Sequence, residues 1–245
     1  MKGVILAGGT GSRLQPLTLV TNKQLLPVYN KPLIYYPFNL LVKAGINDIM
    51  IITSPSHAGH YVRLFESGKK FGVRVTYGIQ ESPDGLAHGL SLAEDFADDE
   101  PVALVLGDNI FEDDVTSHIK NFSGSGAVDF FVEVDDPRQL GCPVFDANGT
   151  LIKIEEKPKQ PKSEYGQTGL YIFDNTCFSK IKTQKPSDRG ELEITDLLNT
   201  YLTNGTLNYE ILTGQWFDTG TFDNLYNATV WAKELQESNP NYFVI

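Results

Sequence analysis

Cysteine, histidine and positive charge are scarce in this chain. Its 245 residues include 2 cysteines and 4 histidines, and neither type shows the spacing of a zinc site. A zinc site is therefore not expected, and two isolated cysteines predict no disulfide. Acidic residues outnumber basic ones by 31 to 20, which gives a net charge of −11. Since nucleic acids and anionic membranes bind basic surfaces, we expect neither as a partner.

Long hydrophobic runs are also missing. No stretch approaches the ~18 apolar residues that a membrane helix needs, and the apolar run near the amino terminus is too short for a signal peptide. We therefore expect a cytoplasmic protein without a membrane segment. With 41% hydrophobic and 21% charged residues, the composition is that of an ordinary globular chain.

The first 23 residues hold the clearest functional signal. Residues 4–7 (VILA) are a short apolar run that predicts a buried strand, and the glycine-rich loop GGTGSR follows directly. Glycines let backbone N–H groups approach an anion without interference from a Cβ atom. Arg13 and Lys23 add positive charge, so the loop suits a polyphosphate. The alternative is a tight turn with surface cations, because Leu14 replaces the third glycine of a dinucleotide-binding loop and no P-loop sequence is present.

Strand-like and helix-like segments alternate through the first half of the chain. Strands are predicted at residues 49–53, 73–79 and 102–106, and helices at 33–44, 61–70 and 86–96. This alternation is typical of a parallel α/β sheet with right-handed crossovers. Ligands bind such sheets beyond the carboxyl ends of the strands. The glycine loop and the turns at residues 83–85 and 107–108 should therefore share one edge.

The pattern changes after about residue 125. Strands at closer spacing are predicted at residues 128–134, 144–146, 151–154 and 168–173, with a hairpin turn at Asn148-Gly149, and helices at 192–201 and 222–235. We predict one α/β domain with a Rossmann-like, mostly parallel sheet flanked by helices. Residues 1–125 and 216–245 form its nucleotide-binding part, and residues 126–215 form an inserted, partly antiparallel lobe.

Two aspartates follow strand-like segments in similar surroundings. Asp108 lies in LVLGDN and Asp218 lies in WFDTGT. Each alone is expected to cap a helix. Together in one α/β chain they form a pair suited to a hard cation, since Mg²⁺ binds one or two carboxylates together with phosphate oxygens.

A resemblance is carried by LAGGTGSRL at residues 6–14 and NKQLLP at residues 22–27. These segments resemble the signature of the sugar-1-phosphate nucleotidylyltransferases. EEKP at 155–158, YGQTGLY at 165–171 and SDRGELEITD at 187–196 match in the expected order, and the match covers nearly the whole chain. The resemblance implies transfer of a nucleotidyl group from dTTP to glucose 1-phosphate, giving dTDP-glucose and pyrophosphate, with Mg²⁺ as cofactor and a homo-oligomeric protein (dimer or tetramer). UTP or another sugar phosphate as substrate, and a non-catalytic sugar-nucleotide-binding protein, stay open as alternatives.

The resemblance also implies roles for individual residues. The nucleotide-binding residues are Leu6, Gly8, Gly9, Gly11, Gln24, Gln80, Gly85 and Asp108; the sugar-phosphate-binding residues are Asn109, Gly141, Glu156, Lys157, Tyr171 and Arg189, in the inserted lobe or beside it; the catalytic residues are Arg13, Lys23, Asp108 and Lys157; and the metal ligands are Asp108 and Asp218. Taken on its own, EEKP is a charged surface turn and Tyr171 is a core residue.

One segment departs from the family pattern. Leu140 stands where most relatives carry a tyrosine, and Val144 stands where an acidic residue is common. Because this segment lies near the sugar in the family, the resemblance implies the type of reaction more firmly than the identity of the sugar.

The implied reaction needs little acid–base chemistry. A sugar 1-phosphate is an anion at neutral pH, so it attacks the α-phosphorus without a general base, and catalysis is mostly positioning and charge neutralisation. We expect Arg13 and the loop amides to bind the triphosphate, Lys23 the α-phosphate or the pyrophosphate, and Lys157 the phosphate of the nucleophile. A sensor protein would lack one of these cations or metal ligands, and none is missing. A nicotinamide dehydrogenase would need a third glycine and an acidic residue after the second strand, which ends in TSP at residues 53–55.

The chain ends at Ile245, soon after the predicted helix at 222–235. In longer relatives a further extension helps to build a second, inhibitory nucleotide site. A coupling between two sites requires both of them, so we expect a sugar nucleotide to inhibit only by competition at the active site.

Overall fold

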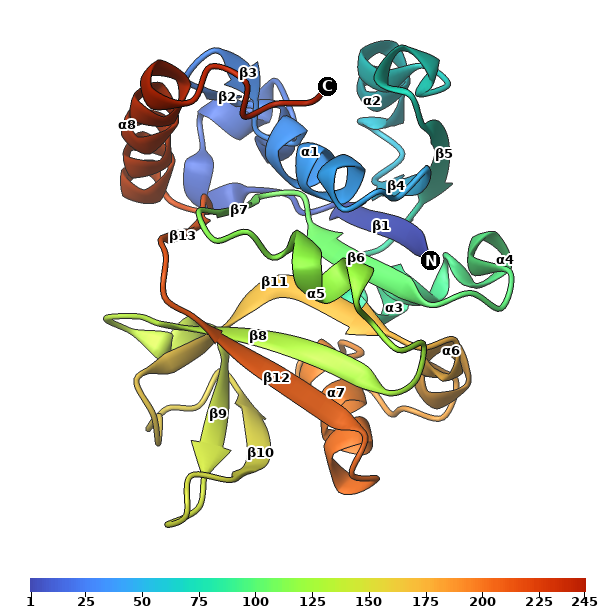
Figure 1. Cartoon of the computed structure of the whole chain (residues 1–245), viewed down its shortest axis with the longest axis vertical. Coiled ribbons are helices and arrows are strands. Elements are labelled where there is room, and N and C mark those ends of the chain that lie inside the picture. Colours follow the sequence, from blue (N-terminus) through green and yellow to red (C-terminus); the bar gives the residue numbers. More distant parts are fainter.

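A seven-stranded sheet forms the centre of the computed structural model, which describes residues 1–245 (Figure 1). Its strand order is β12-β8-β11-β6-β1-β4-β5. All neighbouring strands are parallel except β11, which runs antiparallel to β6 and β8. The strands are β1 (Lys2–Ala7), β4 (Asp48–Thr53), β5 (Arg74–Ile79), β6 (Val102–Leu106), β8 (Ala127–Glu133), β11 (Tyr165–Phe173) and β12 (Leu207–Leu212).

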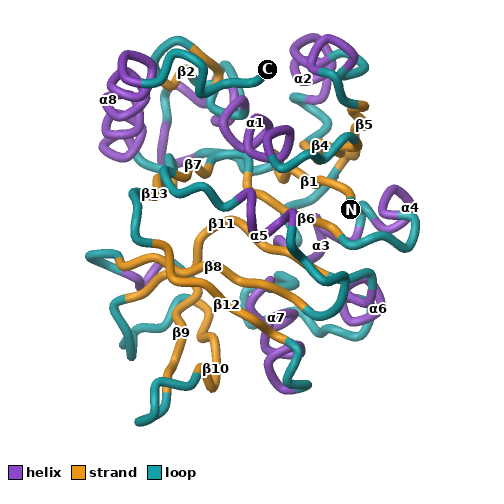
Figure 2. The backbone as a smooth tube through the Cα atoms, in the orientation of Figure 1, coloured by secondary structure: helices purple, strands orange, loops and turns teal.

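Helices cover both faces of this sheet (Figure 2). Strands buried on two faces read as continuous apolar runs, which is why the sequence predicts β1, β4 and β6 correctly. One face packs against α1 (Tyr35–Lys43), α2 (Ala58–Phe65) and α5 (Thr116–Lys120), and the other against α3 (Leu86–Ser91), α4 (Glu94–Ala97), α6 (Thr176–Ile181) and α7 (Ile194–Thr203). The predicted α/β fold class is confirmed.

Two predicted helices are shorter than expected. The helix predicted at residues 61–70 ends at Phe65, because Glu66 and Gly68 adopt positive φ angles of 52° and 82°, which no helix interior accommodates. The helix predicted at 86–96 consists of α3 and α4, and the chain is not helical at Leu92 and Ala93 between them.

Most strands of residues 126–215 belong to the central sheet and do not form a separate one. Three of their strands, β8, β11 and β12, join the sheet beside β6. Only β9 (Gly141–Phe145) and β10 (Leu151–Glu156) pair separately, as an antiparallel hairpin that projects away from the sheet (Figure 1). Its turn carries Gly149 at φ 79°, as the Asn-Gly signal predicts.

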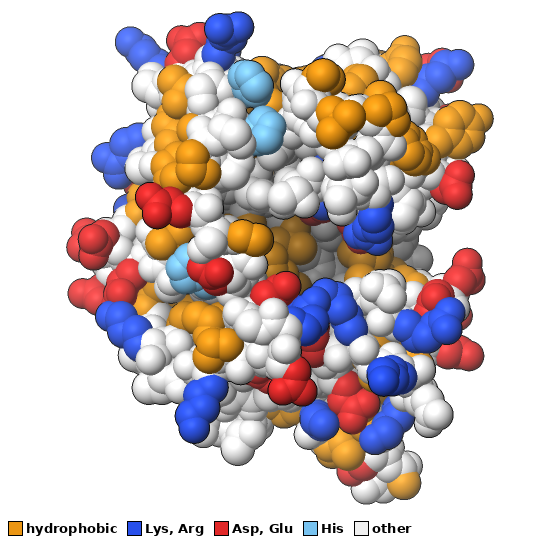
Figure 3. All heavy atoms as spheres, turned by 180° about the vertical axis from the view of Figure 1, so that it is seen from behind, with side chains coloured by type: hydrophobic (Ala, Val, Ile, Leu, Met, Phe, Trp, Pro, Cys, Tyr) orange, Lys and Arg blue, Asp and Glu red, His pale blue; other side chains and the backbone are white.

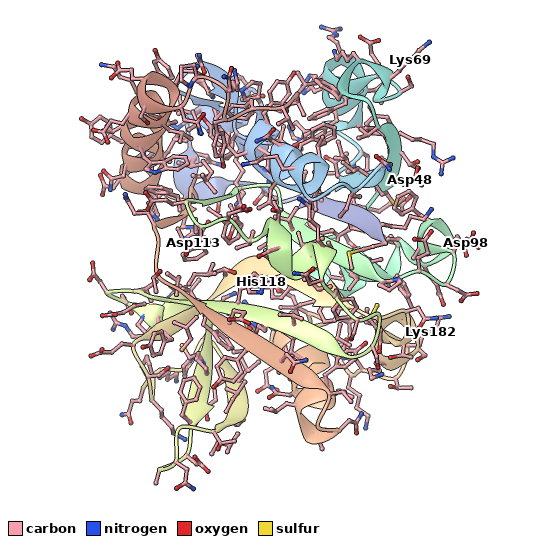
Figure 4. The ribbon with its side chains drawn as sticks, viewed as in Figure 1. Asp48, Lys69, Asp98, Asp113, His118 and Lys182 are labelled. Atoms are coloured by element: carbon pink, nitrogen blue, oxygen red, sulfur yellow. The ribbon has the colours of Figure 1, made fainter.

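A second small sheet brings distant parts of the chain together. β7 (Asn109–Phe111) pairs with β13 (Trp216–Asp218), and Asn109 lies opposite Asp218. Asp113, just after β7, accepts hydrogen bonds from the backbone N–H groups of Thr213 and Gly214 at 3.0 and 2.8 Å (Figure 4). These contacts fix Asp218 beside the carboxyl end of β6.

The carboxyl-terminal helix completes the fold on the same side. The helix α8 (Phe222–Ser238) packs through Trp231 against Phe217 of β13 and against the short hairpin β2 (Pro27–Val28) and β3 (Lys31–Pro32). Short 3-10 turns fill the remaining connections, at Ser12–Leu14, Leu17–Leu19, Lys23–Leu25, Lys69–Phe71 and Pro137–Gln139. None of the helices combines the length and apolar character needed to cross a lipid bilayer.

Candidate active site

Asn22 anchors the segment that carries Lys23 to the end of β1. Its side-chain amide donates to the carbonyl oxygen of Ala7 at 3.3 Å, and its Oδ1 accepts from the N–H of Gln24 and from the hydroxyl of Tyr61 at 3.0 and 2.9 Å. All of these groups are buried. The glycine loop and the lysine that follows it therefore keep a fixed position at the carboxyl edge of the sheet. The sequence motif includes Asn22, but its spacing did not predict this role.

Lys23 and Asp108 form a buried ion pair at this edge. Burial alone lowers the pKa of Lys23, but the Asp108 carboxylate raises it above its ordinary value. Burial would likewise raise the pKa of Asp108, and the ammonium of Lys23 together with the side-chain amide of Asn109, 3.1 Å from Oδ1, holds that pKa below its usual range. Both side chains are thus charged.

Asp218 lies close to this pair. The backbone N–H and the hydroxyl of Thr219 both donate to the carbonyl oxygen of Asp108, at 3.1 and 2.9 Å. Burial raises the pKa of Asp218, and the negative charge of Asp108 raises it further. Two carboxylates near enough to raise each other's proton affinity attract a cation strongly.

The residues present fit a magnesium ion that also binds phosphate. Asp108 and Asp218 supply hard oxygen ligands from facing segments. A magnesium ion that also binds phosphate commonly takes one or two carboxylates. No cluster of three or more potential metal-ligating side chains occurs in the chain. The remaining ligands must then come from the substrate and from water.

One cavity of about 300 Å³ collects most of the predicted charged residues (Figure 3). Seen from behind, the surface is hollowed between the two halves of the molecule, and Lys and Arg side chains border the hollow. Residues far apart in the sequence line this cavity: Arg13, Lys23, Asp108, Asn109, Gly141, Glu156, Lys157, Tyr171 and Asp218. The structure thus brings together the catalytic and metal-binding residues that the sequence predicts.

A neighbouring cavity, also about 300 Å³, lies beside the glycine loop. Gly8, Gly9, Gln80 and Gly85 line it, and Leu86 lines both cavities. The side-chain amide of Gln80 donates to the carbonyl oxygen of Gly85 at 3.3 Å. Gly85 has a φ of 105°, and a Cβ atom there would lie 2.4 Å from the carbonyl oxygen of Leu192. Only glycine fits this turn, which brings the strand end and the start of α3 against the segment before α7.

Some predicted residues lie outside the two cavities. Gln24 is buried behind the loop, and its Oε1 has no hydrogen-bond partner. Arg189 lines neither cavity; it pairs with Glu193 at 2.8 Å and with Glu156 and Glu191 at 3.2 Å each. Leu6 and Gly11 support the loop from within, since Leu6 accepts a backbone hydrogen bond from Gly107 and Gly11 has a φ of 62°.

Several side chains of the first cavity lie in the sequence motifs but were given no individual role from the sequence. Trp216 donates from Nε1 to Oδ1 of Asn109 at 2.7 Å and lines the wall. Gln167 lies on the cavity floor, and its amide nitrogen donates to the fully buried Asp129 at 2.6 Å. Burial raises the pKa of Asp129 to about 8. The signal for this pair was an aspartate inside the apolar run of β8.

Comparisons with known proteins show the family of this chain. The family model for nucleotidyl transferases matches residues 2–234. A curated glucose-1-phosphate thymidylyltransferase of Neisseria gonorrhoeae is 47% identical over 242 residues, 96% of this chain and 84% of the relative, and one of Mycolicibacterium smegmatis is 45% identical over 96% of this chain and 83% of the relative.

Solved structures agree as well. A Bacillus anthracis protein assigned as a glucose-1-phosphate thymidylyltransferase, crystallised with a sucrose, superposes with a TM-score of 0.90 at 47% identity, covering 96% of each chain. A UDP-glucose pyrophosphorylase complexed with UDP-glucose has a TM-score of 0.82 at 22% identity over 95% of this chain and 98% of that chain, and therefore shares the fold. The chain belongs to the nucleotidyl transferase family.

Proposed function

We propose that this enzyme transfers the thymidylyl group of dTTP to glucose 1-phosphate and releases pyrophosphate. The observation that carries the proposal is the convergence of Arg13, Lys23, Asp108, Lys157 and Asp218, drawn from five separate motifs, on one cavity. The printed names of the relatives supply the substrates, because curated proteins 45 to 47% identical to this chain are named for this reaction.

The two cavities suggest how the substrates lie. The cavity with Gln80 and Gly85 accepts the nucleoside, since glutamine offers a donor and an acceptor to a pyrimidine edge. The cavity with Glu156 and Lys157 accepts the sugar phosphate. The glycine loop lies at the nucleoside cavity, and Arg13 and Lys23 lie at the other. The triphosphate then runs along the loop from one cavity to the other.

The chemistry of the site is charge neutralisation. The phosphate of the sugar is already an anion and attacks the α-phosphorus directly, so no general base is required. Consistent with this, the side chains lining the first cavity include no histidine and no cysteine. Lys157 offsets the charge of the nucleophile, and Arg13 and Lys23 offset the charge that develops on the leaving pyrophosphate.

Asp108 and Asp218 would hold a magnesium ion in this scheme. When bound, the ion neutralises phosphate oxygens and aligns the triphosphate for in-line displacement. Lys23, which pairs with Asp108, adds a positive charge next to the same carboxylate. A cytoplasmic location, a homo-oligomeric state and purely competitive inhibition by sugar nucleotides stay predictions.

Release of pyrophosphate tests the proposal. Purified protein is incubated with Mg²⁺, glucose 1-phosphate and either dTTP or UTP, and parallel reactions replace glucose 1-phosphate with galactose, mannose or N-acetylglucosamine 1-phosphate. We expect the highest kcat/KM with dTTP and glucose 1-phosphate. Turnover only with UTP would correct the nucleotide, turnover only with another sugar would correct the acceptor, and no pyrophosphate with any pair would reject the function.

A further inference from the structure

The strand β11 contributes two polar residues to the lining of the first cavity that the reaction described above does not use. Gln167 and Thr168 both line the cavity and are only 5% and 2% exposed. The hydroxyl oxygen of Thr168 is buried and has no hydrogen-bond partner. A buried polar group without a partner is costly in free energy. This strand therefore supplies polar atoms that the reaction described above leaves unassigned.

Asp129 holds one end of the Gln167 amide. On β8, the carboxylate of Asp129 lies on the same face as Phe131, within the apolar cluster that also contains Tyr171. One of its oxygens accepts from the backbone N–H of Phe130 at 2.9 Å, and the other accepts from Nε2 of Gln167 at 2.6 Å. The nitrogen of the amide is therefore turned inward, and its oxygen Oε1 accepts no hydrogen bond from the protein.

The amide oxygen occupies space that a glycine leaves free. A Cβ atom on Gly141 would lie 2.3 Å from Oε1 of Gln167, far inside van der Waals contact. Gly141 itself lines the cavity and pairs with Glu156 across the β9–β10 hairpin. The oxygen of Gln167 thus lies against the backbone of β9 at Gly141, the residue that pairs with Glu156 of β10.

We propose that Gln167 is a sugar-recognising residue whose Oε1 accepts a hydrogen bond from a donor group on the hexose, and that Asp129, in its ionised form, is the positioning residue that sets this polarity. The inference rests on the proposed function and deepens it. The site selects hexose 1-phosphates that carry a hydroxyl or another N–H or O–H donor at the contacted carbon. Leu140, which lines the same cavity, offers no polar group, so Gln167 takes a larger part in reading the sugar.

The test measures kcat/KM for glucose 1-phosphate and for its 2-, 3-, 4- and 6-deoxy and deoxyfluoro analogues. Fluorine cannot donate a hydrogen bond. In the wild-type protein, one deoxy analogue and its fluoro counterpart should each lose about tenfold or more in kcat/KM, because a site built to pair a hydroxyl rejects analogues that lack it. All assays are run at about pH 9, above the pKa of about 8 that burial gives Asp129.

Two variants assign this loss to the amide. In Gln167→Met, kcat/KM for glucose 1-phosphate should fall about tenfold. The variant should no longer discriminate against that one pair of analogues. Its discrimination against analogues changed at the other carbons should stay as in the wild type. In Asp129→Asn, the side-chain oxygen still accepts from Phe130, so the new NH₂ group faces Gln167 and reverses its amide. The ratio of kcat/KM for the matching fluoro analogue to kcat/KM for glucose 1-phosphate should then rise about tenfold above its wild-type value, since the amide nitrogen now faces the sugar. Gln184→Met, a half-buried glutamine outside the cavity, is the control.

Several outcomes would overturn the inference. A folded Gln167→Met variant that keeps the wild-type pattern, or that loses activity equally with every analogue, makes the residue structural. If Gln167→Met does not fold, an unchanged fluoro preference in Asp129→Asn overturns the proposal by itself. Failure of the proposed function is distinct: the wild-type protein would then release no pyrophosphate, and calorimetric binding of the same sugar phosphates would still decide whether Gln167 reads the sugar.

Discussion

For Lys157, the local sequence and the position in the fold indicate different roles. Within EEKP it reads as a surface turn, and it is indeed partly exposed, with a positive φ of 43°. Its position on the wall of the cavity beside Glu156 gives it access to a bound phosphate. The functional interpretation therefore depends on the cavity and not on the turn.

We expect Lys157→Ala to raise the KM for glucose 1-phosphate and to lower kcat/KM by about 100-fold, because two phosphates must then meet without a cation between them. Triphosphate binding, measured by calorimetry, should change little. Lys159→Ala removes the same charge two residues away, outside the first cavity, and should behave as wild type. Equal kinetics in the two variants would return Lys157 to the surface-turn interpretation.

Asp108 and Asp218 should both be needed for metal-dependent activity. Asp108→Asn and Asp218→Asn are each expected to lower kcat by about 100-fold and to raise the Mg²⁺ concentration for half-maximal rate, since a neutral amide oxygen is a weaker ligand than a carboxylate. Asp99→Asn is the control: Asp99 is exposed and has a φ of 60°, which asparagine tolerates. Normal turnover of either site variant at low Mg²⁺ would contradict the paired-carboxylate assignment.

Asp129 should make stability depend on pH in an unusual direction. Its pKa is about 8 in the folded protein and near 3.8 when exposed, so between these values the folded state holds a proton that the unfolded state has lost. The free energy of unfolding should therefore fall as pH rises through this window, by up to about 1.4 kcal/mol per pH unit from this group. Urea unfolding of wild type and Asp129→Asn from about pH 5 to pH 9 isolates the effect. Parallel curves for the two proteins would show that Asp129 stays ionised throughout.

At the scale of single elements, the turn between β5 and α3 depends on a single glycine. Gly85 combines a left-handed φ of 105° with a contact to Leu192 that leaves no room for a Cβ atom. The N–H of Leu192 also donates to the carbonyl oxygen of Asp84 at 2.8 Å. This turn joins the nucleoside cavity to the segment that precedes α7.

Gly85→Ala should destabilise the protein by about 1–3 kcal/mol and raise the KM for the triphosphate, because strain and overlap displace the turn. The matched control is Gly59→Ala in the first turn of α2, where a Cβ atom meets nothing within 4 Å and φ is ordinary. That variant should be unchanged or more stable by up to about 1 kcal/mol. Denaturant midpoints and kinetics of both variants check the prediction, and equal stability would contradict it.

Elements were predictable from sequence where local chemistry determines them. The strand at residues 4–7, the Asn148-Gly149 turn and the glycine loop follow from apolar runs, positive φ preferences and missing side chains. The sheet to which a strand belongs does not follow from such signals. Thus β8, β11 and β12 look like parts of a separate lobe, although long-range pairing places them in the central sheet.

Side-chain partnerships depend on register and were harder to predict. The motifs marked Asp108 and Asp218 as a pair, and the β7–β13 pairing brings them together. Gln167 lies in the YGQTGLY motif, but no motif marks Asp129 as its partner, because their contact depends on the irregular register between β8 and β11. The ion pairs that hold Arg189 likewise arise only from the folded arrangement of Glu156 and Glu193.

At the scale of the whole molecule, the sheet edge, the β9–β10 hairpin and β13 enclose a site in which two anionic substrates meet. Nothing in the cavity lining resembles an activated nucleophile with its base: the lining has lysines and carboxylates but no histidine or cysteine. We therefore expect a single, direct displacement at the α-phosphorus, with no covalent nucleotidyl-enzyme.

The stereochemistry at that phosphorus tests the claim most directly. The protein is incubated with Mg²⁺, glucose 1-phosphate and one diastereomer of dTTP that carries sulfur at the α-phosphorus, and the configuration of the resulting thio-sugar nucleotide is determined by ³¹P NMR. One in-line attack by the sugar phosphate inverts the configuration, and inversion is the result we predict. Retention would require two successive displacements through an enzyme-bound intermediate, and would contradict the account.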